Sequence, residues 1–226
     1  MFLQPQPKTG SRQKVNVYAL LKNAIQFMEL KPGSTISETE LAATLGISRT
    51  PIREALLRLT DELLVEIYPQ RGTYVSRINL PLVREMTYMR HVIEMDVFMT
   101  LCRERVQVAD LVDEKLTLMQ LALKKKDAIA YLMQDEAFHR ALFACRQHEP
   151  VWNIIASTRA HYIRVLVLDM MLPNSLEESY QEHLKIVELI ENGDCETLVD
   201  VLNSHHDSRE LKHESELKAL YPDYFS

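Results

Sequence analysis

Glycine, cysteine and tryptophan are scarce in this chain of 226 residues, which contains five glycines, three cysteines and one tryptophan. Cys102, Cys145 and Cys195 are far apart and form no C-x-x-C pair, so we expect reduced thiols rather than a disulfide framework or a thiolate metal site. The N-terminus lacks the apolar segment of a signal peptide, and no stretch approaches the roughly 18 apolar residues of a membrane span. We therefore expect a cytoplasmic protein with no membrane partner.

The residues that are present favour a globular, mainly helical protein. Hydrophobic residues make up 46% of the chain and charged residues 26%, and leucine, glutamate, lysine and methionine, all good helix formers, are frequent. The net charge is -6, but it is unevenly distributed, with a balance of +3 in residues 1–77 and -9 in the remainder. This asymmetry fits a basic nucleic-acid-binding module joined to an acidic module with another task.

The first module begins with a pattern of short helices. A helix is predicted over about residues 11–30, and Pro32 with Gly33 ends it because together they cannot continue a helix. Ser37 is predicted to cap the N-terminus of a second, short helix that stops at Gly46.

A third helix follows immediately. Ser48 is the expected N-cap, and Pro51 is tolerated because it lies in the first turn. Residues 37–62 therefore read as helix, tight turn and helix, which is the pattern of a helix-turn-helix whose second helix enters the DNA major groove.

A change of period after Glu62 indicates a β-hairpin. The segments LLVEIY and TYVSRI are rich in β-branched and aromatic residues, and the PQRG turn between them contains Pro69 and Gly72. A hairpin directly after a recognition helix is a wing. Arg71 at its tip supplies a cation, and Gly72 permits close approach of the backbone to a phosphate.

The rest of the chain shows no strand signal and is predicted to form six or seven helices, the clearest at 80–104, 108–125, 127–146, 149–170, 175–192 and 194–218. The fold class is therefore mainly α. We expect a winged helix-turn-helix of three helices and a small hairpin over residues 1–77, followed by an all-helical bundle over 78–226.

The string LKPGSTISETELAATLGISRTPIREALLRL, followed by LVEIYPQRGTYV, closely resembles the N-terminal winged helix-turn-helix of the GntR family of bacterial transcriptional regulators. The all-helical remainder is similar to the ligand-binding, dimerising domain of the FadR branch, called the FCD domain. One departure from the family pattern is Leu63, which stands where the family usually carries a glycine after the recognition helix.

The resemblance implies a set of DNA-contacting residues at the start of the recognition helix and at the wing: Ser48, Arg49, Thr50, Arg53, Arg71 and Gly72. Arg49 and Arg53 are four residues apart, so they share one helix face near the end that enters the groove. Arginine can donate two hydrogen bonds to guanine O6 and N7. Arg58 lies farther along and is expected to touch the DNA backbone or to pair with Glu54 or Glu62.

A second constellation is the DEAFH segment, in which Asp135 and His139 project from one helix face. Such a pair can hold a divalent ion, although a surface Asp–His contact is the commoner reason for this spacing. Metal-binding FCD domains, which the sequence resembles, carry D-x3-H on one helix, a histidine beginning the penultimate helix and one in the last helix. Asp135, His139, His183 and His205 match these positions, whereas His206 faces about 100° away. The implied cofactor is Zn²⁺, Ni²⁺ or Mn²⁺.

Arg90 occupies a position where related domains often have an arginine, and it is a candidate clamp for the carboxylate of an effector. A salt bridge to Glu94, four residues on, is an equally open alternative.

The sequence thus predicts a homodimeric repressor that binds a double-stranded DNA operator and is controlled by a small carboxylate or sugar acid at a metal site. Two alternatives stay open: a regulator that responds to the metal directly, and a metal-dependent enzyme acting on small carboxylates, since an Asp-His cluster can activate water. No nucleophile or general base is evident beside the ligands, so we expect no catalytic residue and no enzyme activity.

Overall fold

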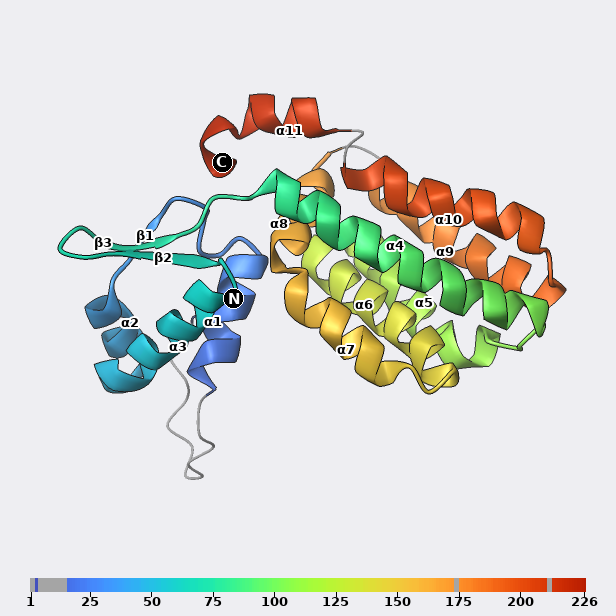
Figure 1. Cartoon of the computed structure of the whole chain (residues 1–226), viewed down its shortest axis with the longest axis horizontal. Coiled ribbons are helices and arrows are strands. Elements are labelled where there is room, and N and C mark those ends of the chain that lie inside the picture. The colour runs from blue at the N-terminus through green and yellow to red at the C-terminus, as the bar shows by residue number, and fades with distance from the viewer. Residues whose placement is uncertain (1–2, 4–15, 173–174, 211–212) are drawn as a thin grey trace. The chain divides into compact units, whose positions relative to one another are not determined.

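The chain divides into two compact units (Figure 1). The first combines the described part of Met1–Leu80 with Leu220–Ser226, and the second is Pro81–Ala219. The computed structural model describes residues 3, 16–172, 175–210 and 213–226. Within these ranges, none of the helices combines the length and the apolar character needed to cross a membrane.

In its described residues the first unit contains three α-helices, a short 3-10 helix (Pro222–Tyr224) and a three-stranded antiparallel sheet of order β1-β3-β2. The elements are α1 (Val17–Gln26), β1 (Thr35–Ile36), α2 (Glu38–Leu45), α3 (Arg49–Asp61), β2 (Val65–Tyr68) and β3 (Gly72–Val75). The hairpin β2–β3 pairs Val65 with Val75 and Tyr68 with Gly72, so the turn lies where the sequence predicts the wing. The third strand, β1, was not predicted because two residues are too few to show an alternating pattern.

The helix ends follow the predicted caps, with two differences. The Ser37 hydroxyl accepts a hydrogen bond from the Glu40 amide at 3.2 Å, and Gly46 ends α2 with a φ of 66°. Ser48 is the N-cap residue of α3, but its side chain makes no capping hydrogen bond. Helix α1 ends at Gln26 rather than near residue 30, because Met28 adopts a left-handed φ of 63°. Residues 11–15 of the predicted first helix lie outside the described residues.

Helices α1 and α3 pack against each other through apolar side chains that are fully buried: Leu21, Ala24 and Ile25 from α1, and Ile52, Leu56 and Leu59 from α3. Each such side chain contributes roughly 1.5–3 kcal/mol relative to an exposed one. Because this face of α3 is committed to the core, Arg49 and Arg53 are left on the exposed side of the helix.

The end of the chain adds a short parallel β-bridge to the first unit, between Ile78 and Phe225. The Ile78 amide donates to the Tyr224 carbonyl at 2.7 Å, and the Ser226 amide donates to the Ile78 carbonyl at 3.1 Å. This pairing joins residues almost 150 positions apart, so no local pattern in the sequence could predict it.

In its described residues the second unit is built from eight helices, which confirms the mainly α fold class (Figure 1). Helix α5 packs against α6 and α9, α10 packs against α9 and α8, and α6 packs against α7. The helices are α4 (Leu80–Arg103), α5 (Ala109–Lys125), α6 (Ala128–Cys145), α7 (Glu149–Thr158), α8 (Ala160–Asp169), α9 (Ser175–Asn192), α10 (Cys195–Glu210) and α11 (Glu214–Leu220).

The helix predicted over 149–170 is in fact two helices, because Arg159 leaves the helical conformation with a φ of -88° and a ψ of 16°. Neither glycine nor proline marks the break. Arg159 is almost fully buried, and its guanidinium pairs with Glu136 of α6 at 2.8 Å, so a tertiary contact accompanies the interruption. The helix predicted over 194–218 corresponds to α10 and α11, with residues 211–212 between them outside the described residues.

Leu63 is a site of backbone strain. It directly follows the C-cap of α3 and has a φ of 60°, a left-handed conformation that costs a side chain with a Cβ about 1–2 kcal/mol. Its side chain is 55% exposed, so packing does little to offset this cost. The family pattern of a glycine at this position has a direct physical reason here, since glycine adopts this φ without strain.

Replacing Leu63 with glycine should therefore stabilise the protein. The relief of backbone strain stabilises the folded state, and the greater flexibility of glycine in the unfolded chain offsets part of this gain. The free energy of unfolding should rise by about 1 kcal/mol in total, and Tm by roughly 2–4 °C. Thermal denaturation followed by circular dichroism measures the change. Leu63→Ala keeps the Cβ and serves as the control. An equal gain in both variants would show that the leucine side chain, not the backbone, is the source of the effect.

Candidate functional site

The exposed face of α3 holds two of the candidate DNA-contacting arginines together. Arg49 Nη2 lies 2.9 Å from Glu38 Oε2, and Arg53 Nη2 lies 3.1 Å from the same oxygen. Hydrogen bonds from the two guanidinium groups lower the pKa of Glu38. Ser48 and Thr50 are exposed beside them, so one end of the helix presents two cations and two hydroxyls.

The wing residues form a separate group. Arg71 and Gly72 are exposed at the turn between β2 and β3, and the Arg71 guanidinium lies 5.8 Å from the centre of the Tyr68 ring. The Tyr74 hydroxyl donates to the Arg71 carbonyl at 2.8 Å and braces the turn. Gly72 has a φ of 121°, so the turn needs the glycine for its backbone conformation.

Arg58 has a different environment from Arg49 and Arg53. Its guanidinium lies 3.9 Å from the centre of the Tyr18 ring of α1, a cation–π contact that the sequence did not predict. The Tyr18 hydroxyl in turn donates to the Glu62 carboxylate, which pairs with Lys22 at 2.6 Å. Arg58 therefore contributes to the contact between α1 and α3.

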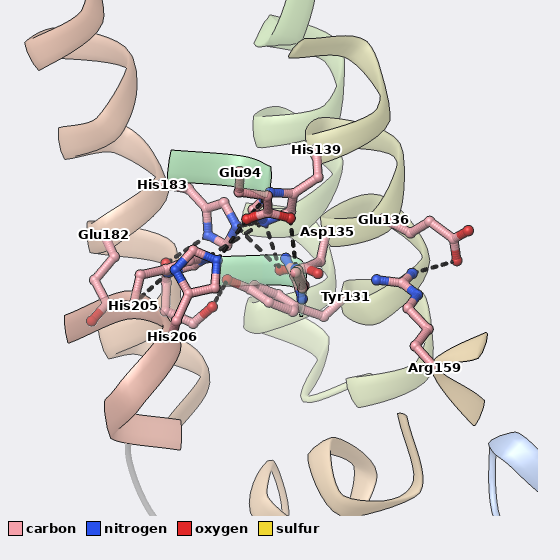
Figure 2. A network of polar contacts seen from close by, with 12 residues as sticks. Glu94, Tyr131, Asp135, Glu136, His139, Arg159, Glu182, His183, His205 and His206 are labelled. Carbon is pink, nitrogen blue, oxygen red and sulfur yellow. Dashed lines mark hydrogen bonds and ion pairs between the residues drawn. The ribbon is translucent and has the colours of Figure 1, made fainter. Parts of the chain in front are cut away.

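In the second unit, three histidines from three helices converge on one point (Figure 2). His139 comes from α6, His183 from α9 and His205 from α10, and all three are buried. His139 Nε2 lies 3.3 Å from His183 Nε2 and 3.4 Å from His205 Nε2. Two nitrogen ligands of a tetrahedral metal with bonds of about 2.0–2.1 Å stand about 3.3 Å apart, so this triad could hold a metal ion.

Asp135, one turn before His139 on α6, faces the same point. Its Oδ1 lies 3.1 Å from His183 Nε2 and 3.9 Å from His139 Nε2, and the carboxylate is buried. The structure therefore brings together the four residues that the sequence selected. His206 lies in the neighbouring direction on α10, where its Nε2 is 2.7 Å from Glu94 and its Nδ1 is 2.7 Å from the Leu202 carbonyl.

The outer nitrogen of each of the three imidazoles faces an oxygen. His183 Nδ1 lies 2.7 Å from the Ser179 carbonyl, and His205 Nδ1 lies 2.9 Å from Glu182. His139 Nδ1 lies 3.2 Å from Glu94. An acceptor at Nδ1 holds a proton there, which is the arrangement that surrounds metal-ligating histidines. His183 Nε2 also donates to Asp135 Oδ1 at 3.1 Å, so a metal bound to this nitrogen would replace that proton.

Glu94 is the residue of the candidate site that the sequence did not indicate. It is fully buried and contacts three partners. It pairs with Arg90 Nε at 2.6 Å, and it also pairs with the side chains of His139 and His206 (Figure 2). Of the two alternatives open for Arg90, the structure thus shows the salt bridge to Glu94. Arg90 also donates from Nη1 to the Tyr162 hydroxyl at 2.7 Å. The spacing of four residues from Arg90 is the only local signal that could have drawn attention to Glu94.

Burial and neighbouring charged groups determine the protonation states of the side chains at this site. Burial, opposed by Glu94, lowers the pKa of His139 to about 4, so this imidazole is neutral at pH 7. Burial alone would raise the pKa of Asp135, but the hydrogen bond from His183 and the nearby His139 and Arg90 outweigh it and hold that pKa well below its usual range. Burial alone would also raise the pKa of Glu94, but the charge of Arg90 outweighs it and holds that pKa well below its usual range. Glu94 and Asp135 are therefore two ionised, buried carboxylates near the guanidinium of Arg90.

Aromatic rings fix the position of His139. Its ring is nearly parallel to those of Phe98 and Trp152, with interplanar angles of 12° and 9°. Trp152 also lies close to two guanidinium groups, those of Arg159 at 5.0 Å and Arg90 at 5.8 Å from its ring. A cation-rich aromatic wall therefore borders the imidazole cluster.

Comparison with known proteins agrees with this division into a DNA-binding and a ligand-binding unit. The profile of "Bacterial regulatory proteins, gntR family" matches residues 13–75, and that of the FCD domain matches residues 85–208. The chain belongs to the GntR family of bacterial transcriptional regulators and carries an FCD domain.

Individual relatives are similar over most of their length. An uncharacterised HTH-type transcriptional regulator in an unstable DNA locus of Streptomyces ambofaciens is 30% identical, over 87% of this chain and 83% of its own. The HTH-type transcriptional repressor RspR of Escherichia coli is 26% identical, over 85% of this chain and 86% of the RspR chain. The solved structure of E. coli McbR/YncC shares the fold, with a TM-score of 0.71 at 23% identity over 91% of this chain and 96% of that one.

Removing the charge of Glu94 should strongly destabilise the second unit. Glu94→Gln leaves the buried guanidinium of Arg90 without its anionic partner, which costs about 3 kcal/mol and lowers Tm by roughly 6–12 °C. Thermal denaturation of the metal-free protein measures the loss. The control is Glu188→Gln, which breaks an exposed pair with Lys185 and should change stability by less than about 0.5 kcal/mol. Similar losses in the two variants would contradict the central position given to Glu94.

Proposed function

We propose that this regulator is a homodimeric repressor whose binding to an operator is controlled by a small carboxylate or sugar acid at a metal site in the FCD domain. The observation that carries the proposal is the convergence of three buried Nε2 atoms and the Asp135 carboxylate in the unit joined to a winged helix-turn-helix. A single recognition helix reads only a short half-site, so two copies on a near-palindromic operator are expected.

Operator recognition is assigned to Ser48, Arg49, Thr50 and Arg53, with Arg71 and Gly72 at the wing. Arg49 and Arg53 are exposed and their only ion-pair partner among the described residues is Glu38, so they can exchange this acid for guanine edges or phosphates. Arg58 is not assigned to DNA because it lies over Tyr18.

Arg49→Ala should weaken binding to the specific operator by about 1–3 kcal/mol, because a bidentate contact to a base is lost, and should weaken non-specific binding much less. Fluorescence anisotropy at fixed salt, with operator and scrambled duplexes, measures both. Lys124→Ala, which removes a positive charge from α5 in the other unit, is the matched control. If Arg49→Ala leaves the specificity ratio unchanged, the assignment of this helix face to base recognition is wrong.

For the metal, we assign Asp135, His139, His183 and His205 as ligands. Three imidazoles and one carboxylate suit Zn²⁺, Ni²⁺ or Mn²⁺, and the ion would supply a Lewis-acidic centre that anchors an effector carboxylate. The two ionised carboxylates near one arginine favour a divalent cation at this place.

The metal assignment predicts a stabilisation that depends on these ligands. Adding Zn²⁺ or Ni²⁺ to the chelator-treated protein should raise Tm by several degrees through mass action, and His205→Gln should abolish most of that rise. Differential scanning fluorimetry with a metal titration measures it. His148 is the exposed N-cap residue of α7, so His148→Gln should show the same metal-dependent rise in Tm as the wild type. An equal loss in both variants would point to non-specific histidine–metal binding.

For the effector, we assign the carboxylate to the metal and to the Arg90 guanidinium. The contacts of Arg90 with Glu94 and Tyr162 use Nε and Nη1, and Nη2 is the group that we assign to the effector. The nearby Arg159 adds a second positive charge on the Trp152 side. Effector binding changes the DNA affinity only if it favours one conformation of the regulator over another.

A thermal-shift screen of sugar acids and short carboxylates, with and without metal, tests the effector assignment. A ligand that acts through the metal and Arg90 should raise Tm only in the metal-loaded protein. Arg90→Lys should lose most of the ligand shift, because lysine has a single nitrogen and cannot bind Glu94, Tyr162 and the effector as the three guanidinium nitrogens do, and should keep the metal shift. If operator binding responds to metal alone and no carboxylate has an effect, the protein is a direct metal-responsive regulator instead.

A further inference from the structure

Two of the three cysteines lie in contact although they are 93 residues apart. Cys102 is the penultimate residue of α4 and is fully buried, and Cys195 is the first residue of α10 and is half-buried. The Cys195 thiol donates to Cys102 Sγ over a distance of 3.0 Å, and the Cys102 thiol donates to the Leu189 carbonyl at 3.5 Å. The metal site and the DNA-binding face leave this pair without a function.

The surrounding backbone holds the two sulfur atoms in this position. Gly193 turns the chain between α9 and α10 with a φ of 72°, and the Arg105 side chain fills the space beside it, 2.6 Å from where a Cβ would lie. Asp194 caps α10 by accepting a hydrogen bond from the Thr197 amide at 3.1 Å. Glu191 accepts from the Val108 amide at 2.8 Å, which ties the end of α9 to the start of α5. The contact between the thiols is thus part of a fixed arrangement at one end of the bundle.

We propose that Cys102 and Cys195 are a redox-sensitive pair that forms a reversible intramolecular disulfide when a hydroperoxide oxidises the protein. The two sulfur atoms of a disulfide are about 2.05 Å apart. Because the sulfur atoms of Cys102 and Cys195 are already 3.0 Å apart, they need to move only a short distance to form the bond. The proposal concerns the helix ends and is independent of the metal and of the effector.

The reaction balances with hydrogen peroxide as the oxidant. The Cys195 thiolate attacks one peroxide oxygen, the O–O bond breaks, and Cys195 becomes a sulfenic acid while hydroxide leaves and takes up the proton that the thiol released. The Cys102 sulfur then attacks the Cys195 sulfur, and the sulfenic oxygen leaves as water with the Cys102 proton. Two thiols and one peroxide give one disulfide and two water molecules.

The order of these steps follows from accessibility. Cys195 is half-buried and can meet a peroxide, whereas Cys102 is fully enclosed. Burial, together with the neighbouring Cys195, raises the pKa of Cys102 to about 12, so Cys102 stays protonated until a sulfenic acid forms beside it. Cys195 is therefore the attacking thiol and Cys102 the resolving one.

The bond would connect two helices that carry the polar site. Helix α4 supplies Arg90 and Glu94, and α10 supplies His205 and His206. Oxidation would fix the separation of these helices at one end and so restrict any movement between them.

The test is oxidation of the full-length, chelator-treated protein with hydrogen peroxide, followed by alkylation and peptide mapping under non-reducing conditions. The expected product is a chain that is not cross-linked to another chain, with one remaining thiol and a peptide that links Cys102 to Cys195, and dithiothreitol should restore all three thiols. Because the bond closes a loop of 93 residues, the oxidised protein should melt at least roughly 5 °C above the reduced one.

Matched variants make the outcome decisive. Cys195→Ser should abolish the linked peptide and the rise in Tm, and circular dichroism before oxidation checks that this half-buried position tolerates the change. Cys145→Ser should behave like the wild type. Cys145 is a stringent control because it lies at the same end of the bundle as Cys102. Its neighbour Arg146 pairs with Glu104, which directly follows α4. A link to Cys145, a cross-link between chains, or irreversible oxidation of Cys195 without a disulfide would overturn the proposal.

Discussion

The buried ion pair between Arg90 and Glu94 is the interaction on which the second unit depends. A carboxylate without solvent is tolerated only when charged or hydrogen-bonding groups surround it, and Glu94 obtains these from α4, α6 and α10 through Arg90, His139 and His206. The three helices must therefore pack in one register. The same register turns the Nε2 atom of His139 toward His183. One set of contacts thus stabilises the unit and also positions the side chains that we propose as metal ligands.

The two units use charge in opposite ways. In the winged helix-turn-helix, Arg49 and Arg53 are exposed and share Glu38 as their ion-pair partner. The surrounding water keeps these ion pairs weak, so a DNA phosphate can take the place of Glu38. In the FCD domain the charges of Arg90, Glu94 and Asp135 are buried, and each has partners that are costly to remove. Exposed pairs of this kind suit the DNA contacts proposed for Arg49 and Arg53, which must form and break. Buried pairs suit the proposed metal site, whose ligands would have to be in position before an ion binds.

Local features were predictable because they depend on residues a few positions apart. The caps at Ser37 and Gly46, the hairpin around Gly72 and the placement of Asp135 and His139 on one helix face all follow from short-range spacing. The break at Arg159 was not predictable, since a tertiary ion pair accompanies it and no glycine or proline marks it. The β-bridge between Ile78 and Phe225 was not predictable either, because it joins residues that are far apart in the sequence.

The sequence by itself determined the class of fold, the DNA-binding module and the four residues proposed as metal ligands, because each leaves a mark in spacing or in a family motif. Only the tertiary structure decided that Glu94 stands between Arg90 and His139, that Arg58 lies over Tyr18, and that two distant thiols meet. These contacts depend on how whole helices are placed against each other. That placement minimises the free energy of the entire core, so it leaves no signature in any short segment of the chain.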